Sequence, residues 1–279
     1  MPIRLLGFTP LFTVLALTPA FASDQLPAVS APNLKADLAA GSSDGDLAGI
    51  SSLSATVPIG DASGFQLDSA FGKVGDQNLG GAGAHLFWRD PNSMLLGVTG
   101  MVSRVEGASD NLARAGLESE FYQGNFTISA SAGGQWDFRG TTAYSSVGTS
   151  YYVTPNFILS SRVSGFSNVR TIQIGSEYRA KSHSRTTFYA DIGTDNDHNE
   201  FALAGIRFSF GGTGKTIKDR DRQDDPINIV SSLMSSSAQA VKERTGAVKE
   251  PTVAVKEPTV AVPKTTVVNG GGGGGSVNC

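Results

Sequence analysis

Residues 126–136, which read FTISASAGGQW, carry the pattern that decides the fold. Phe126 and Trp136 stand at the two ends of one face, with Ile, two Ala and Gly between them. Thr127 and Gln135 bound the other face, which carries small polar residues. Successive side chains of a β-strand point to opposite sides, so a period of two residues predicts a strand with one apolar and one polar face.

The same alternation recurs through the middle of the chain. Each segment is roughly 8–13 residues long, close to the roughly 9–11 residues with which a tilted strand crosses a bilayer. Strands of ordinary globular proteins are shorter, typically about 5 or 6 residues. The pattern predicts about twelve strands, near 33–40, 47–58, 64–73, 81–89, 94–104, 111–122, 125–137, 141–153, 156–165, 169–180, 185–193 and 200–210.

The connections between these segments alternate in character. Tight turns follow even-numbered segments, at 90–92, 123–125 and 154–156. Longer polar loops are expected after odd-numbered ones, at 41–46, 75–80, 106–110 and 194–200. Barrels of the bacterial outer membrane have short periplasmic turns and longer external loops. An even strand number would then place both ends of the barrel in the periplasm.

The polar faces carry charges of both signs. In a closed barrel these side chains would meet across the lumen, whereas in a soluble sandwich they would face water. Lipid tolerates no open sheet edge, which favours an all-β fold in the form of a transmembrane, antiparallel, up-and-down β-barrel. The candidate lumen-lining residues are Arg114, Glu118, Arg162, Glu177, Arg179, Asp191 and Arg207, of which the four arginines are expected to shape the field in the lumen.

The N-terminus predicts export. Arg4 precedes an apolar run, and Ala20-Phe21-Ala22 has the form of a signal-peptidase site, so residues 1–22 are interpreted as a signal peptide. A lead segment, 23–32, follows it. The barrel is assigned to 33–210 and a periplasmic tail to 211–279.

The tail combines three kinds of sequence. Residues 227–244 predict a helix, which begins after acidic residues and Pro226 and carries a weak apolar stripe. AVKEPTV repeats occupy 247–267, and their prolines predict an extended spacer before a glycine-rich end. A helical and disordered tail of this kind could reach peptidoglycan, which is therefore a candidate partner.

The sequence predicts neither an enzyme nor a metal or cofactor protein. The formal net charge of −3 gives no reason to expect a nucleic-acid partner. No G-x-S-x-G elbow accompanies the three histidines, of which His85 is expected to point into the lumen beside Phe87. The acidic loop 195–200 lacks the spacing of a calcium loop and is expected to be solvated. No catalytic, cofactor-binding or metal residue is assigned.

Two stretches resemble known families. Residues 205–210, GIRFSF, resemble the terminal-strand signal that the outer-membrane barrel assembly machinery recognises. Residues 64–68, 80–91 and 95–97 look like a group of uncharacterised proteobacterial porin-like proteins, a likeness that extends over the greater part of the chain. The resemblance implies a barrel in the bacterial outer membrane, with outer-membrane lipid and the assembly machinery as partners. It implies no activity.

Three hypotheses remain open from the sequence. The first is an outer-membrane, porin-like channel for small polar solutes or ions. The second is a closed structural barrel that tethers the outer membrane to the cell wall or presents surface loops. The third is a soluble secreted β-protein. About twelve strands lie between small barrels filled by side chains and open porins, so strand number alone does not decide between the first two.

Overall fold

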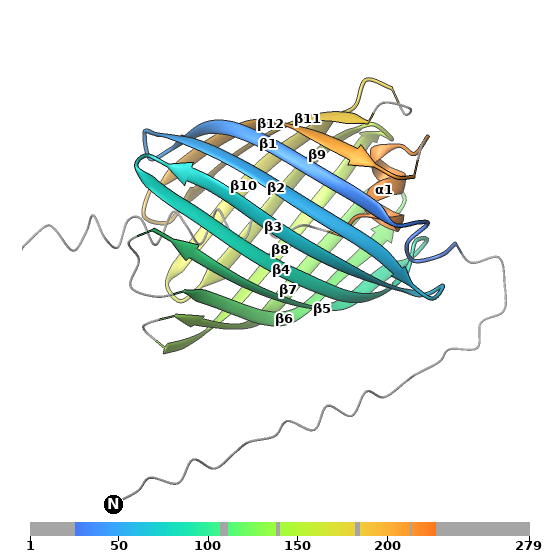
Figure 1. Ribbon diagram of the computed structural model, residues 1–279, viewed down its shortest axis with the longest axis horizontal. Coiled ribbons are helices and arrows are strands. Elements are labelled where there is room, and N and C mark those ends of the chain that lie inside the picture. Colours follow the sequence, from blue (N-terminus) through green and yellow to red (C-terminus); the bar gives the residue numbers. More distant parts are fainter. Residues whose placement is uncertain (1–25, 107–110, 138–139, 182–184, 213, 227–279) are drawn as a thin grey trace, which may run out of the picture.

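The protein folds into one closed antiparallel barrel of twelve strands (Figure 1). The computed structural model describes residues 26–106, 111–137, 140–181, 185–212 and 214–226. The predicted signal peptide, the predicted helix at 227–244 and the repeats at 247–267 lie outside these residues. The strands are β1 (Asn33–Ser43), β2 (Asp46–Ile59), β3 (Ser63–Val74), β4 (Gln77–Asp90), β5 (Met94–Val105), β6 (Leu112–Gln123), β7 (Phe126–Asp137), β8 (Gly140–Thr154), β9 (Phe157–Phe166), β10 (Val169–Tyr178), β11 (Thr186–Asp195) and β12 (Glu200–Phe210).

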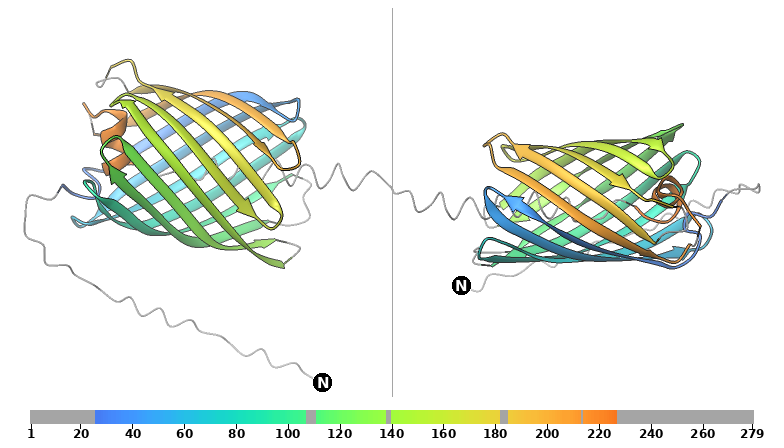
Figure 2. Two further views of the ribbon diagram at one scale, coloured as in Figure 1. Left: turned by 180° about the vertical axis from the view of Figure 1, so that it is seen from behind. Right: turned by 90° about the horizontal axis from the view of Figure 1, so that it is seen from above.

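Each strand pairs with its neighbours in the sequence, and the first strand pairs with the last. The β1–β12 ladder runs from Leu34 opposite Phe210 to Ser43 opposite Phe201. Closure leaves no edge with unpaired backbone groups, which is the property that a sheet in lipid requires. The two views of Figure 2 show the strongly tilted strands that close the barrel. The predicted fold class and strand number are therefore confirmed.

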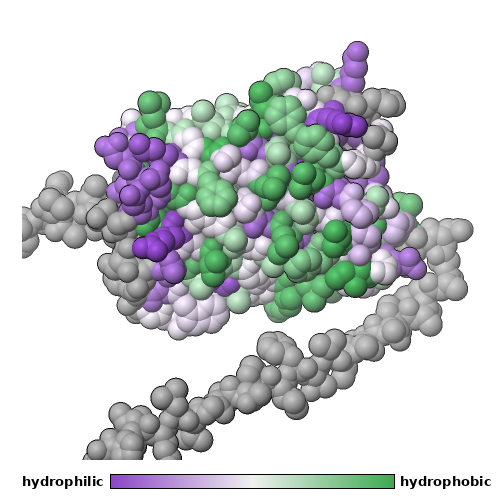
Figure 3. Space-filling view, viewed as in Figure 1, coloured by the Kyte–Doolittle hydropathy of each residue, from purple (hydrophilic) through white to green (hydrophobic). Residues whose placement is uncertain are grey.

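The outer surface of the barrel is apolar. Leu117 at the middle of β6 is 66% exposed, and Ile174 at the middle of β10 is 54% exposed. Figure 3 shows hydrophobic side chains spread across the middle of the visible wall, with hydrophilic residues gathered toward the two ends. Exposed aromatic residues near strand ends include Phe71, Phe121, Phe126, Trp136, Tyr151 and Phe188. The face predicted to be apolar thus points outward, not into a core.

Two of the predicted long loops are wrong. β1 and β2 are joined by Asp44 and Gly45, and β3 and β4 by Gly75 and Asp76. Both turns use positive φ values, 53° at Asp44 and 56° at Gly75, which glycine and aspartate accept more readily than most residues. The alternation continues through 41–43 and 77–80, so these residues extend the strands instead of forming loops.

A short helix, α1 (Ile217–Gln223), lies at the end of the barrel where β1 begins and β12 ends (Figure 1). We call this the α1 end, and the opposite one the far end. Thr216 caps the helix, because its hydroxyl accepts from the Asp219 amide and the Asp219 carboxylate accepts from the Thr216 amide. No helix was predicted here, although T-I-K-D has the form of a capping box. Among the described residues, no helix is long and apolar enough to cross a membrane.

The lead segment and α1 fill the mouth at the α1 end. Val29 is 1% exposed and packs with Phe87, Leu95 and Tyr122, all on the inward face. Ile217 of α1 is 2% exposed and packs on Tyr152 and Ile158. Hydrophobic burial of this kind is worth about 1.5–3 kcal/mol for a fully buried aliphatic side chain, which favours the docked position of both segments.

The far end of the inward face differs from the expected polar lining. Inward side chains of β2, β3, β4, β5 and β12 form an apolar cluster there. Its members are Ala48, Ile50, Ala70, Val74, Leu79, Met101, Val105 and Leu203, with Leu112 and Phe201 packed against it. The inward face is therefore apolar along part of one wall and polar elsewhere. The alternation places these residues inward, but their chemistry does not follow the polar pattern of β7.

Candidate functional site

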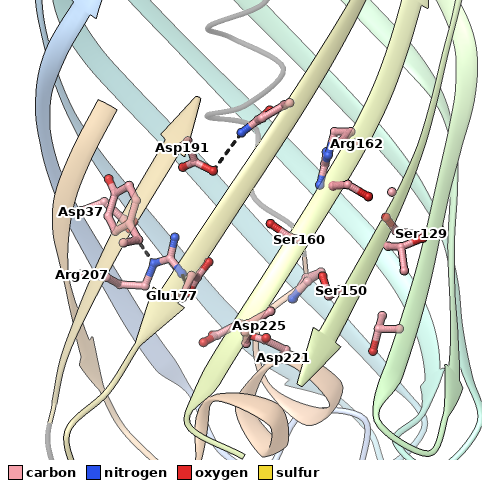
Figure 4. Close-up of a pocket in the computed structure, with 18 of the residues that line it drawn as sticks. Asp37, Ser129, Ser150, Ser160, Arg162, Glu177, Asp191, Arg207, Asp221 and Asp225 are labelled. Carbon is pink, nitrogen blue, oxygen red and sulfur yellow. Dashed lines mark hydrogen bonds and ion pairs between the residues drawn. The ribbon is translucent and has the colours of Figure 1, made fainter. Parts of the chain in front are cut away.

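The candidate site is a cavity of about 180 Å³ inside the barrel, which we call the main chamber. Figure 4 shows charged side chains from several strands and from the chain after α1 facing one another in it. Its charged lining residues include Arg162, Glu177, Asp191 and Arg207, all of which were predicted to face the lumen. Lys35, Asp37, Glu120, Asp221 and Asp225 line it as well.

Arg207 is the centre of the polar network on one wall of the chamber. Its Nε donates to Asp37 Oδ1 at 2.6 Å, and its Nη1 donates to Glu177 Oε2 at 2.6 Å. The guanidinium lies 5.1 Å from the centre of the Tyr189 ring. Asp37 also accepts from the Ser52 hydroxyl at 3.1 Å. Two carboxylates on one guanidinium fix its position and connect β1, β10 and β12 along this wall.

Two carboxylates reach the chamber from the chain beyond the barrel. Asp221 of α1 accepts from the Tyr152 hydroxyl at 3.1 Å. Asp225 is 8% exposed, and its Oδ2 accepts from Arg220 Nε at 3.2 Å. Neither residue is predictable from strand alternation, because both reach the lumen only when α1 folds back into the barrel mouth.

Burial, together with Glu177 and Asp225 nearby, raises the pKa of Asp221 to about 7. The docked segment therefore binds more protons than a released segment between about pH 4 and pH 7. The docked state therefore becomes less stable as pH rises through this window, and above pH 7 its stability no longer changes with the protonation of Asp221.

We expect the urea concentration at the midpoint of unfolding to decrease between pH 4 and pH 7. Asp221→Asn should remove that part of the slope.

The control for this prediction is Asp76→Asn, since the side chain of Asp76 is fully exposed at the far end. This variant should keep the wild-type slope. An unchanged slope in Asp221→Asn would contradict the assignment.

A second polar cluster joins three strands on the opposite wall. His85 of β4 points inward, as expected, and is 4% exposed. Its Nε2 lies 3.1 Å from Asp68 Oδ2, and its Nδ1 lies 2.8 Å from Glu118 Oε2. Gln66 donates to Asp68 at 2.9 Å. The cluster connects β3, β4 and β6, and the groups that His85 contacts are carboxylates.

The seven predicted lining residues fall into three places. Four line the main chamber, as described above. Arg114 and Glu118 border a second cavity of about 60 Å³, which Arg162 also borders. Arg179 lies at the α1 end, where Nε donates to Thr187 Oγ1 at 3.0 Å and Nη1 to the Lys215 carbonyl at 3.1 Å. Their effect on a field in the lumen stays a prediction.

In the acidic loop between β11 and β12, the Asp195 carboxylate bonds within the loop. Asp195 Oδ1 accepts from the amides of Asp197 and Asn199, at 2.8 and 3.0 Å. Asp44 Oδ1 accepts from the amide of Glu200 at 3.0 Å. Within the described part of the chain, no group of three or more His, Cys, Asp or Glu residues could hold a metal ion.

No protein-family model and no curated protein sequence matches the chain. Solved structures do resemble it. The KdgM porin has a TM-score of 0.53 at 12% identity, over 63% of this chain and 99% of that one. The KdgM porin in complex with disordered oligogalacturonate has a TM-score of 0.52 at 10% identity, over 63% and 99%.

Outer membrane protein Omp33 of Acinetobacter baumannii has a TM-score of 0.45 at 12% identity, over 64% of this chain and 98% of that one. The two KdgM structures, whose TM-scores exceed 0.5, are porins. At these identities, the likeness to the KdgM porin shows the fold: this chain is a closed β-barrel of the kind that porins have.

Proposed function

We propose that the protein resides in the bacterial outer membrane and acts there as a porin-like channel for small polar solutes or ions. The location rests on the outward apolar surface of a closed barrel. Many large hydrophobic side chains are more than a third exposed, among them Leu38, Leu67, Leu117, Val163, Ile192 and Phe210. In a soluble secreted protein this surface would meet water, which makes that hypothesis the weakest of the three.

A charge on the outer wall tests the location. Leu117 lies at the middle of β6, whereas Leu47 lies beside the far-end turn and is 84% exposed. In lipid, we expect Leu117→Arg to destabilise the folded barrel by about 2–4 kcal/mol and Leu47→Arg by about 0–1 kcal/mol. Urea unfolding in lipid vesicles measures both. Equal, small effects would contradict the membrane location.

The channel proposal rests on one observation: the main chamber is a cavity between charged and hydroxyl side chains that is large enough for water. A cavity of about 180 Å³ lined by Ser, Thr, Arg and carboxylate groups can hold several water molecules, as a route for polar solutes requires. Reconstitution of the full-length protein in planar bilayers tests it. Discrete conductance steps are the expected result, and their absence at all voltages would reject the channel.

The closed structural barrel is the second candidate, and a specific observation favours it. α1 and the lead segment occupy the α1 end, with Ile217 2% exposed and Ala28 fully buried. On this hypothesis, the chain after the barrel would tether the membrane to peptidoglycan. Under both hypotheses we place the tail in the periplasm, because the described residues after β12 lie at the α1 end, where β1 begins and β12 ends.

We also propose that the outer-membrane barrel assembly machinery recognises the GIRFSF segment of β12.

A further inference from the structure

Arg114 is buried in the barrel, and it forms no ion pair with a carboxylate of the described residues. It points inward from β6 and is 7% exposed. Its Nε donates to Gln135 Oε1 at 2.7 Å, and Gln135 donates in turn to Asp137 at 3.2 Å. Among the described residues, Arg114 Nη2 has no hydrogen-bond partner. A buried charge without a counterion is strongly unfavourable, so the geometry leaves a place for a negative group.

Two aromatic rings hold the guanidinium in place. Its Cζ atom lies 5.3 Å from the centre of the Tyr144 ring and 5.0 Å from the centre of the Phe166 ring. Contacts with ring faces stabilise a cation without using its N–H donors. Arg114 is therefore fixed by rings and by one neutral amide, while its buried Nη2 atom has no hydrogen-bond partner among the described residues.

Two cavities border the Arg114 side chain. Arg114 borders the cavity of about 60 Å³ and a smaller one of about 20 Å³, and Arg162 borders both. The described residues that line the smaller cavity include Tyr144, Ser146 and Ser164 and no carboxylate. The larger cavity contains Glu118 and Glu120 together with His85. One water molecule needs roughly 10–15 Å³ of such cavity volume, so the larger cavity accepts a small ion or a few waters and no large solute.

We call the space beside Arg114 in these cavities the Arg114 pocket. We propose that it binds a small monovalent anion, either an inorganic halide or the carboxylate group of a small solute. The ligand accepts from Arg114 Nη2 and receives further donors from the serine hydroxyls that line the two cavities. The proposal goes beyond the channel function and does not depend on it, since an ion can bind in a barrel that does not conduct.

The test uses the full-length protein folded in detergent, in sodium gluconate, whose anion is too large for the cavity. Sodium bromide or sodium acetate replaces the gluconate at constant ionic strength. Binding to the folded state alone should raise the Tm of the wild type by roughly 3 °C at an anion concentration about five times the Kd. A rise with both salts indicates that the pocket accepts a carboxylate, and a rise with bromide alone restricts it to inorganic anions.

Arg114→Gln should abolish the rise, and the matched control Arg104→Gln should retain it, because Arg104 is exposed on β5. Equal rises in wild type and Arg114→Gln would overturn the proposal. Bromide-soaked crystals of the wild type give a second measurement that needs no variant. An anomalous peak beside Arg114 Nη2 is expected, and a map without one would also overturn the proposal. Neither result is affected if the bilayer experiment shows no conductance.

Discussion

A chain that ends at Gly212 is expected to conduct ions far better in planar bilayers than the full-length protein. The truncation removes α1 and the segment around it from the barrel mouth. Asp224, which is fully buried there, accepts from the Ser30 amide at 3.0 Å, the Ser30 hydroxyl at 2.7 Å and Lys215 Nζ at 2.7 Å. These contacts join the segments that precede and follow the barrel, so their loss should open the mouth.

The matched control is a chain that ends at Pro226. It lacks 227–279, as the first truncation does, but keeps α1 and its contacts. A large difference between the two chains therefore isolates residues 213–226. Both should keep a barrel that resists detergent before heating, since all twelve strands are present. Equal conductance of the two truncated chains would show that α1 does not obstruct the mouth.

Replacement of Arg207 by methionine is expected to have the largest effect on stability. The change leaves Asp37 and Glu177 without the guanidinium that both contact at 2.6 Å. Asp37 is 4% exposed and Glu177 about a quarter exposed, so at least one carboxylate would be buried without a counterion. Removal of one member of a buried ion pair costs about 3–5 kcal/mol. Urea unfolding in vesicles measures this loss.

A second variant separates the charge effect from lost packing. In Asp37→Asn combined with Arg207→Met, one of the stranded charges is absent, and we expect part of the stability to return. A double-mutant cycle gives the coupling between the two side chains. Additive effects would show that Arg207 contributes by packing and not through its contact with Asp37.

The strands could be predicted closely because each has one face toward the outside and one toward the interior. In such a strand, apolar and polar residues alternate with a period of two, as at 126–136, and the residues near the middle of each strand follow this alternation. The strand ends at 41–46 and 75–80 were misassigned, because small and polar residues there are compatible with both a loop and a strand. Two-residue turns at Asp44–Gly45 and Gly75–Asp76 decide between them.

The candidate site could be predicted only in part. Alternation placed Arg162, Glu177, Asp191 and Arg207 on the inward face. The sequence pattern does not predict which of these side chains contact one another. The Arg207 contacts depend on the closure of β12 onto β1, which sets Asp37 opposite Arg207. Asp221 and Asp225 depend on the return of the chain into the mouth. The capping box at Thr216 was a signal for α1, but not for where the helix docks.

The most direct test of the account is the electrophoretic mobility of the protein extracted from outer membranes, compared without and after boiling. A closed barrel that resides in the membrane should resist detergent when unheated and migrate differently from the boiled, unfolded chain. We therefore predict that the protein fractionates with the outer membrane and shows this shift. Recovery of the protein in the soluble fraction, with the same mobility before and after boiling, would contradict the proposed outer-membrane barrel.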